Sequence, residues 1–170
     1  MAAFVRGINV GGHRPVAMGD LRSVFSELGL GNVRTLLQSG NVVFTTTDGA
    51  ARLKPVVEAK CRERLGHDVT IMLRTEPEMK KVVAGNPFAQ AATDPTKVHV
   101  LFLADKPSTG AVAKLDPHRF APDEWLLEGR HVYVYYPNGA GRSKLRLELG
   151  TSATARNWNT VTKVLTSMTS

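Results

Sequence analysis

The sequence predicts an α+β protein with a ferredoxin-like βαββαβ half at residues 1–74 and a second, smaller α+β half with a C-terminal helix at residues 75–170. Two observations predict the first half: short β-favouring runs, and two helical patterns set between them. The second half is predicted by an apolar run, a hairpin pattern and a final amphipathic stretch. We expect the two halves to form one compact unit.

Composition places the chain among globular proteins, with 42% hydrophobic and 22% charged residues. Cys61 is the single cysteine, so an intrachain disulfide is impossible and a reducing compartment is the simpler interpretation. No stretch approaches the roughly 20 apolar residues that a membrane span requires, and no basic region of a secretory signal precedes the apolar start. We therefore expect a cytoplasmic protein with no membrane partner.

Positive charge gathers in the last quarter of a chain whose net charge is +7. Residues 76–129 carry six basic and eight acidic side chains, whereas residues 130–170 carry six basic side chains and only Glu148 as an acid. This asymmetry favours an anionic partner, either a small ligand or nucleic acid. Many unrelated globular proteins are equally basic, so charge alone does not identify that partner.

The first half begins with a strand at residues 3–8 that Gly11 and Gly12 should stop. A helix at residues 18–28 follows, because Leu21, Val24, Phe25 and Leu28 recur at helical spacing. The runs 33–38 and 42–46 should pair as an antiparallel hairpin around Ser39-Gly40-Asn41, where glycine and asparagine tolerate positive φ.

A second helix is marked by Pro55, which suits a first helical position, and by Val57, Cys61 and Leu65 on one face. That spacing makes Cys61 a core residue. A strand at residues 69–73 completes the βαββαβ order, and Thr75 with Glu78 forms a capping box for the next helix.

The second half contains an apolar strand at residues 98–104, expected at the centre of its sheet, and a hairpin that joins residues 125–127 to 132–136. A glycine-rich loop at residues 137–141 leads into Arg142-Ser143-Lys144. Residues 144–149 alternate like a strand, but a short helix is also consistent with the caps that follow. The last helix is expected to begin near Arg156, with Trp158 packed inward.

Three segments together resemble one known family: Arg6-Gly7-Ile8-Asn9-Val10-Gly11-Gly12, Gln38-Ser39-Gly40-Asn41-Val42-Val43-Phe44, and Thr154-Ala155-Arg156-Asn157-Trp158-Asn159-Thr160-Val161. With Asn86-Pro87-Phe88 and Tyr136-Pro137-Asn138-Gly139 between them, they are similar to the bacterial domain-of-unknown-function family 1697. The resemblance implies an α+β fold with a ferredoxin-like beginning, and it implies no activity. Residues 144–150 form a shorter segment than the family usually has.

Glycines that precede a helix expose backbone N–H groups to an anion, so the stretch from Arg6 to Gly12 is a candidate anion loop. It lacks both the Gly-Lys-Ser/Thr ending of a P-loop and the dinucleotide spacing of glycines. The alternative is architectural: the glycines permit a tight crossing and Asn9 bonds to nearby backbone. A hairpin turn likewise explains Ser39 better than a nucleophile does, because the Gly-x-Ser-x-Gly elbow is absent.

Arg156 and Asn157 form a second candidate centre, where they and the first helical amides would face an anion. Alternatively, Trp158 is simply core, and Arg156 binds a carbonyl or a carboxylate. The complete set of candidate ligand-binding residues is Arg6, Asn9, Gly11, Gly12, Ser39, Asn41, Arg142, Lys144, Arg156 and Asn157.

Three hypotheses of function follow. The first is a binding module for an anionic partner, nucleic acid or a nucleotide-like ligand. The second is an enzyme that acts on a small phosphorylated or carboxylated metabolite, for which no nucleophile or acid–base pair can be named. The third is a structural or protein-interaction role. We expect no cofactor, and the spacing of the five histidines predicts no metal site.

Overall fold

The computed structural model describes residues 1–9, 15–89 and 93–170. It divides into two compact units: unit 1 comprises Met1–Lys80 with Val164–Ser170, and unit 2 comprises Lys81–Lys163. Each unit contains one four-stranded antiparallel sheet. The predicted α+β class is therefore confirmed. No helix in the described ranges is long and apolar enough to cross a membrane.

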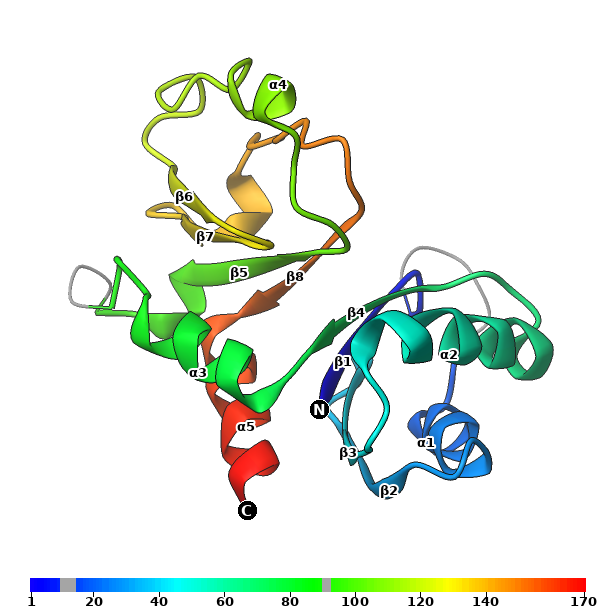
Figure 1. The fold of residues 1–170 in the computed structure, drawn as a ribbon. Coiled ribbons are helices and arrows are strands. Elements are labelled where there is room, and N and C mark those ends of the chain that lie inside the picture. The colour runs from blue at the N-terminus through cyan, green and yellow to red at the C-terminus, as the bar shows by residue number, and fades with distance from the viewer. Residues whose placement is uncertain (10–14, 90–92) are drawn as a thin grey trace. The chain divides into compact units, whose positions relative to one another are not determined.

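Unit 1 has the predicted ferredoxin-like order of elements (Figure 1). They are β1 (Ala2–Arg6), α1 (Met18–Glu27), β2 (Gly31–Leu36), β3 (Asn41–Thr45), α2 (Ala50–Leu65) and β4 (Thr70–Arg74). The strands lie in the order β2-β3-β1-β4, so β1 is an inner strand. β1 ends at Arg6, earlier than predicted, because Gly7 adopts a φ of 89° that a strand does not accommodate.

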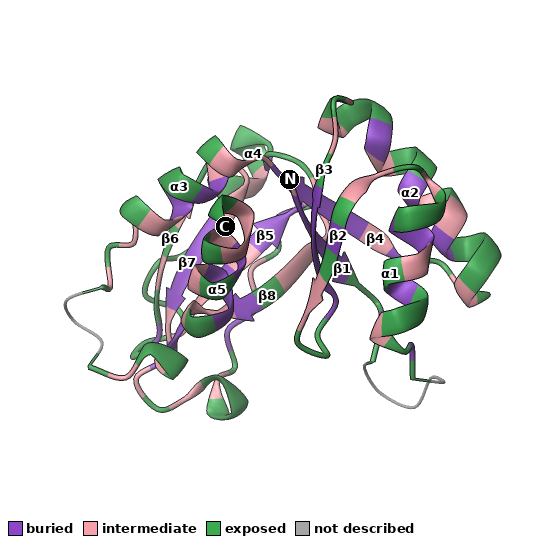
Figure 2. Ribbon diagram, turned by 90° about the horizontal axis from the view of Figure 1, so that it is seen from below, coloured by how far each residue is buried: buried purple, intermediate pink, exposed green. Residues whose placement is uncertain are grey.

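The core of unit 1 lies between one face of its sheet and the inner faces of α1 and α2. Both helices carry buried residues at intervals along a mostly exposed surface (Figure 2). Phe25 of α1 packs on Phe44 of β3 with ring centroids 5.2 Å apart. Cys61 is fully buried, as its helical spacing predicts, and burial raises the pKa of its thiol to about 12. That thiol is a core group and not a nucleophile.

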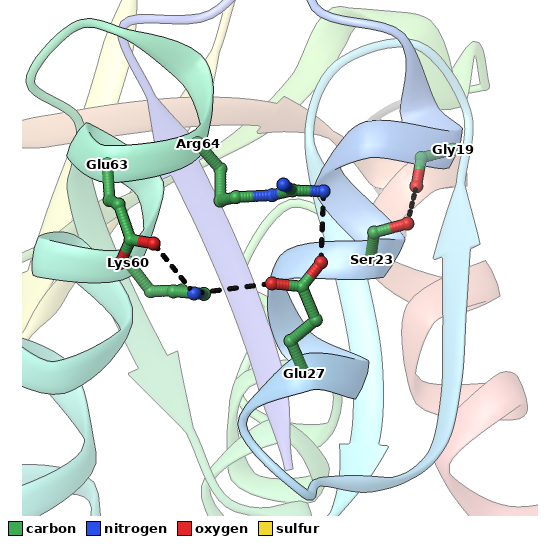
Figure 3. A network of polar contacts seen from close by, with 6 residues as sticks. All are labelled: Gly19, Ser23, Glu27, Lys60, Glu63 and Arg64. Carbon is green, nitrogen blue, oxygen red and sulfur yellow. Dashed lines mark hydrogen bonds and ion pairs between the residues drawn. The ribbon is translucent and has the colours of Figure 1, made fainter.

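Charged side chains join α1 to α2 at their exposed edge (Figure 3). Glu27 of α1 accepts from Lys60 at 3.2 Å and from Arg64 at 3.0 Å, and Lys60 also contacts Glu63 at 3.0 Å. Ser23 donates to the Gly19 carbonyl within α1. Such ion pairs at the protein surface contribute little to the free energy of unfolding, so the stability of the helix pair comes mainly from its buried faces.

The predicted start of α2 at Pro55 is wrong, because the helix begins at Ala50 and Pro55 lies inside it. Proline removes the bond that the Ala51 carbonyl would otherwise accept. Ala51 is exposed, so water can solvate that carbonyl. The predicted capping box is confirmed: the Glu78 amide donates to Thr75 Oγ1 at 3.4 Å, and the Thr75 amide donates to Glu78 Oε2 at 2.7 Å.

Unit 2 repeats the strand order of unit 1 in a second sheet. Its elements are β5 (Val98–Leu103), α4 (Thr109–Val112), β6 (Glu124–Glu128), β7 (His131–Tyr135) and β8 (Ala153–Asn157), with short 3-10 turns at Pro95–Lys97 and Ala140–Arg142. α3 (Glu76–Ala84) and α5 (Trp158–Thr169) each contribute residues to both units. The order β6-β7-β5-β8 makes β5 an inner strand and confirms the β6–β7 hairpin.

One connection differs between the two sheets. Unit 1 has the long helix α2 between its third and fourth strands, whereas residues 136–152 of unit 2 form an irregular chain with a single 3-10 turn. Both predictions for residues 144–149, strand and short helix, are therefore wrong. Leu145 and Leu149 are buried in a cluster with Val132 and Val134. The alternating pattern reflects these two anchors in an extended segment that pairs with no strand of the sheet.

Candidate functional site

The candidate residues divide between the two units. Arg6, Asn9, Ser39 and Asn41 belong to unit 1, and Arg142, Lys144, Arg156 and Asn157 belong to unit 2. Gly11 and Gly12 lie outside the described residues.

Asn9 uses its whole side-chain amide to join three stretches of unit 1. Its Nδ2 donates to the carbonyls of Gln38 and Val16 at 3.0 and 3.2 Å, and its Oδ1 accepts from the Val16 amide at 2.7 Å. The first loop and the β2–β3 turn are therefore neighbours. Because these bonds engage both ends of the amide with backbone, Asn9 has an architectural role, which was the alternative weighed against an anion loop. Arg6 is exposed at the end of β1.

The β2–β3 turn is held by Asn41, which is fully buried in β3 and does not lie in the turn as predicted. Its Nδ2 donates to the Leu36 carbonyl at 2.8 Å and to Ser39 Oγ at 3.0 Å. Positive φ falls on Leu37 and Gly40, with values of 59° and 74°. A Cβ on Gly40 would lie 2.5 Å from Ile8 Cδ1 and 3.1 Å from Val5 Cβ, so the crowding adds to the strain that the positive φ gives any other residue there.

The prediction that Arg156 and Asn157 begin the last helix is wrong, because both residues lie in β8. Arg156 is buried and donates to Thr154 Oγ1 at 2.7 Å and to the Ala155 carbonyl at 2.8 Å. Its burial lowers the pKa of the guanidinium to about 10. Asn157 Oδ1 accepts from the Thr160 amide and hydroxyl, each at 2.9 Å. The helix amide predicted to face an anion is thus bonded to Asn157 itself.

In each unit, the last strand along the chain has a buried arginine at or next to its end, and the residue that follows this arginine caps the next helix. Arg74 closes β4 and donates to the Leu73 carbonyl at 2.8 Å, and Thr75 then caps α3. Arg156 near the end of β8 donates to the carbonyl before it at the same distance, and Asn157 then caps α5. The arginines therefore belong to the repeated architecture.

Replacing Asn157 by alanine should lower the free energy of unfolding by about 1 kcal/mol, because α5 loses its cap. Urea denaturation followed by circular dichroism measures this change. Asn159→Ala provides the control, since Asn159 is exposed on the same helix and alanine favours helix formation. Equal stability of the two variants would contradict the capping role.

Arg142 and Lys144 line a pocket of about 360 Å³ in unit 2. We refer to it as the Arg142 pocket; it is lined by Arg119, Phe120, Ala121, Pro122, Asp123, Asn138, Arg142, Ser143 and Lys144. Two chain segments form it, one before β6 and one after β7. Ser143 Oγ donates to Asp123 Oδ2 at 2.6 Å and so fastens the two segments together.

Backbone bonds shape both segments. The Arg142 amide donates to the Gly139 carbonyl at 3.1 Å, which closes the 3-10 turn before Ser143. The Leu145 amide donates to Ser143 Oγ at 2.9 Å, and the Asp123 amide donates to the Phe120 carbonyl at 3.0 Å. The Arg119 guanidinium lies 5.3 Å from the centroid of the Phe120 ring. A cation–π contact therefore orients this side chain over an apolar wall.

Sequence reasoning missed Arg119, Asp123 and Ser143 as site residues. It placed Ser143 only between the two basic residues that follow the glycine-rich loop. The two segments are about twenty residues apart and share no motif, so no spacing signals their contact. Only the basic character of residues 142–144 pointed toward the pocket.

A second hollow, of about 750 Å³, lies in unit 1 and includes Arg22, Arg34, Glu76 and Met168 in its lining. The Arg34 guanidinium already donates to the Ser167 carbonyl and the Ser170 hydroxyl. The lining of this hollow has two cationic side chains and the Glu76 carboxylate, whereas the Arg142 pocket has three cationic side chains and one carboxylate, so the Arg142 pocket is the better anion site. Among the described residues, no three His, Cys, Asp or Glu side chains gather as a metal site requires.

Comparisons with known proteins agree with the fold. A solved structure of the conserved bacterial protein SP0830 from Streptococcus pneumoniae is similar with a TM-score of 0.74 at 22% sequence identity, covering 98% of this chain and 97% of that chain. At that identity the similarity shows the fold alone. No curated protein matches the chain. The family model described as "Protein of unknown function (DUF1697)" matches residues 1–133, which include the first segment of the Arg142 pocket. The chain therefore belongs to the DUF1697 family.

Proposed function

We propose that this protein is a binding module for a small anionic ligand, which it holds in the Arg142 pocket. One observation carries the proposal: Arg119, Arg142 and Lys144 line one small pocket in which Asp123 is the sole carboxylate among the lining residues. Like charges repel one another, so such a cluster is best accommodated when an anion lies among them.

The charges of the pocket are available to a ligand. All three cationic residues are exposed, and within the described ranges none of them forms an ion pair. Asp123 supplies one negative charge against their three positive charges, so the pocket lining keeps a net positive charge. Guanidinium groups bind phosphate and carboxylate oxygens through paired N–H donors, whereas Lys144 adds a point charge.

The size of the pocket favours a small ligand over a nucleic acid. A volume of about 360 Å³ falls at the lower end of the range for metabolite sites. A polymer would instead be expected to contact an extended basic groove. A nucleotide-like or other phosphorylated metabolite is thus the better version of the anionic partner.

Titration calorimetry at low salt tests the proposal with inorganic phosphate, nucleoside monophosphates and small organic phosphates. We expect measurable binding that weakens with added salt. Arg142→Glu should lower the affinity at least roughly tenfold, since a hydrogen bond to a charged group contributes about 1.5–3 kcal/mol.

Lys106→Glu is the matched control, because Lys106 is exposed in unit 2, carries the same charge and does not line the pocket. It should leave the affinity nearly unchanged. Equal losses in the two variants would indicate nonspecific charge attraction, and no binding of any probe would overturn the proposal.

A further inference from the structure

We infer that the ligand of the Arg142 pocket carries a hydrogen-bond donor, a hydroxyl or an ammonium group, beside its anionic group, and that Asp123 binds this donor. The inference rests on the proposed function and specifies the class of ligand. It comes from the presence of a buried carboxylate among three cationic side chains.

Asp123 is positioned to act on whatever enters the pocket. Asp123 is only 8% exposed, yet it lines the pocket. Its backbone is fixed by the bond from its own amide to the Phe120 carbonyl. Ser143 Oγ also donates to one oxygen of the carboxylate, which holds the Asp123 side chain at the wall of the pocket where a ligand would meet it.

The hydrogen-bonding capacity of Asp123 is only partly used. Ser143 Oγ accepts from the Leu145 amide at 2.9 Å, so its single proton is directed to Asp123 Oδ2 at 2.6 Å. Among the described residues, no group donates to Asp123 Oδ1. An ionised carboxylate offers about four lone-pair sites, and Asp123 Oδ1 is not one of the buried side-chain atoms that lack a partner, so a donor that enters the pocket can reach it. A donor on the ligand supplies what the protein does not.

The negative charge of Asp123 also acts on a neighbouring group of unit 2, the Tyr136 hydroxyl. Burial raises the pKa of Tyr136, and the Asp123 carboxylate raises it further. A ligand that is purely anionic would meet this charge directly. A ligand with a donor on one side and an anionic group on the other matches both parts of the lining, because the cations bind the anion and Asp123 binds the donor.

The remaining walls fit a short carbon skeleton between these two groups. Phe120 contributes an apolar surface, and Asn138 contributes an amide that can donate or accept. With the pocket volume of about 360 Å³, this composition suits a small organic anion such as a hydroxylated or aminated alkyl phosphate.

The test compares three probes of similar size: sn-glycerol 3-phosphate, phosphoethanolamine and propyl phosphate. Each is titrated calorimetrically into the wild-type protein and into Asp123→Asn. The wild type should bind at least one donor-bearing probe roughly 10- to 150-fold more tightly than propyl phosphate, as expected for a hydrogen bond to a charged acceptor. Asp123→Asn should lose this preference and bind propyl phosphate at least as well as the wild type does.

The outcomes separate this inference from the proposed function. Equal affinity of the wild type for all three probes overturns the inference but leaves anion binding intact. Absence of binding by every probe, inorganic phosphate included, overturns both. If Asp123 only fastens the two segments through Ser143, Asp123→Asn will lower the melting temperature and keep the preference, which overturns its role in recognition. Should that variant not fold, the probe comparison in the wild type still decides the ligand class.

Discussion

Replacing Phe44 by alanine is expected to lower the free energy of unfolding by about 3–5 kcal/mol, the range for removing a buried aromatic side chain. Phe44 is 1% exposed and packs on Phe25, so its loss leaves a cavity between β3 and α1. Such a change is a large part of the 5–15 kcal/mol that stabilises a typical domain. Chemical denaturation measures it.

Val56→Ala is the control for this prediction. Val56 lies on α2 and is 46% exposed, so truncation should change stability by less than about 0.5 kcal/mol. A cost below about 1 kcal/mol for Phe44→Ala would show that the two aromatic rings do not form the core contact described above.

Replacing Asn41 by alanine should lower the free energy of unfolding by about 2–3 kcal/mol, because two acceptors in unit 1 lose their hydrogen-bond donor. The Leu36 carbonyl and Ser39 Oγ both accept from Asn41 Nδ2. Without these two hydrogen bonds, the turn is no longer held with Leu37 at a φ of 59°, a conformation that is strained for a branched side chain. Denaturation and the loss of slowly exchanging amides in β2 and β3 report the change.

Ser39→Ala separates the two bonds of Asn41. It removes the exposed acceptor and keeps the bond to the Leu36 carbonyl, so its cost should be well below that of Asn41→Ala. If Asn41→Ala leaves stability unchanged, the role assigned to this residue in the turn is wrong.

Unit 1 could be predicted from the sequence because each of its elements carries a local signal. The spacing of Leu21, Val24 and Phe25 defines the inner face of α1, and Thr75 with Glu78 caps α3 as expected. These features depend on residues within one turn of each other. Such short-range features can be predicted from the spacing of residues along the sequence.

The candidate site could be predicted only in part, because its geometry depends on contacts between distant residues. Arg142 and Lys144 were selected for their charge, whereas Asp123 and Ser143 meet across the fold and share no local pattern. Arg156 was misplaced because strand and helix signals overlap where β8 runs directly into α5. Its burial and its backbone bonds come from tertiary packing, which overrides local preference.

The irregular connection after β7 has a consequence for how this fold can change between relatives. A helix in that position would have to keep its periodicity, because each inserted residue rotates its buried face by about 100°. Residues 136–152 form a chain anchored at Leu145 and Leu149, so the loop before those anchors can gain or lose a residue without disturbing the sheet. This loop carries Arg142, Ser143 and Lys144, so under the proposed function a change in its length would alter the Arg142 pocket while the strand order stays the same.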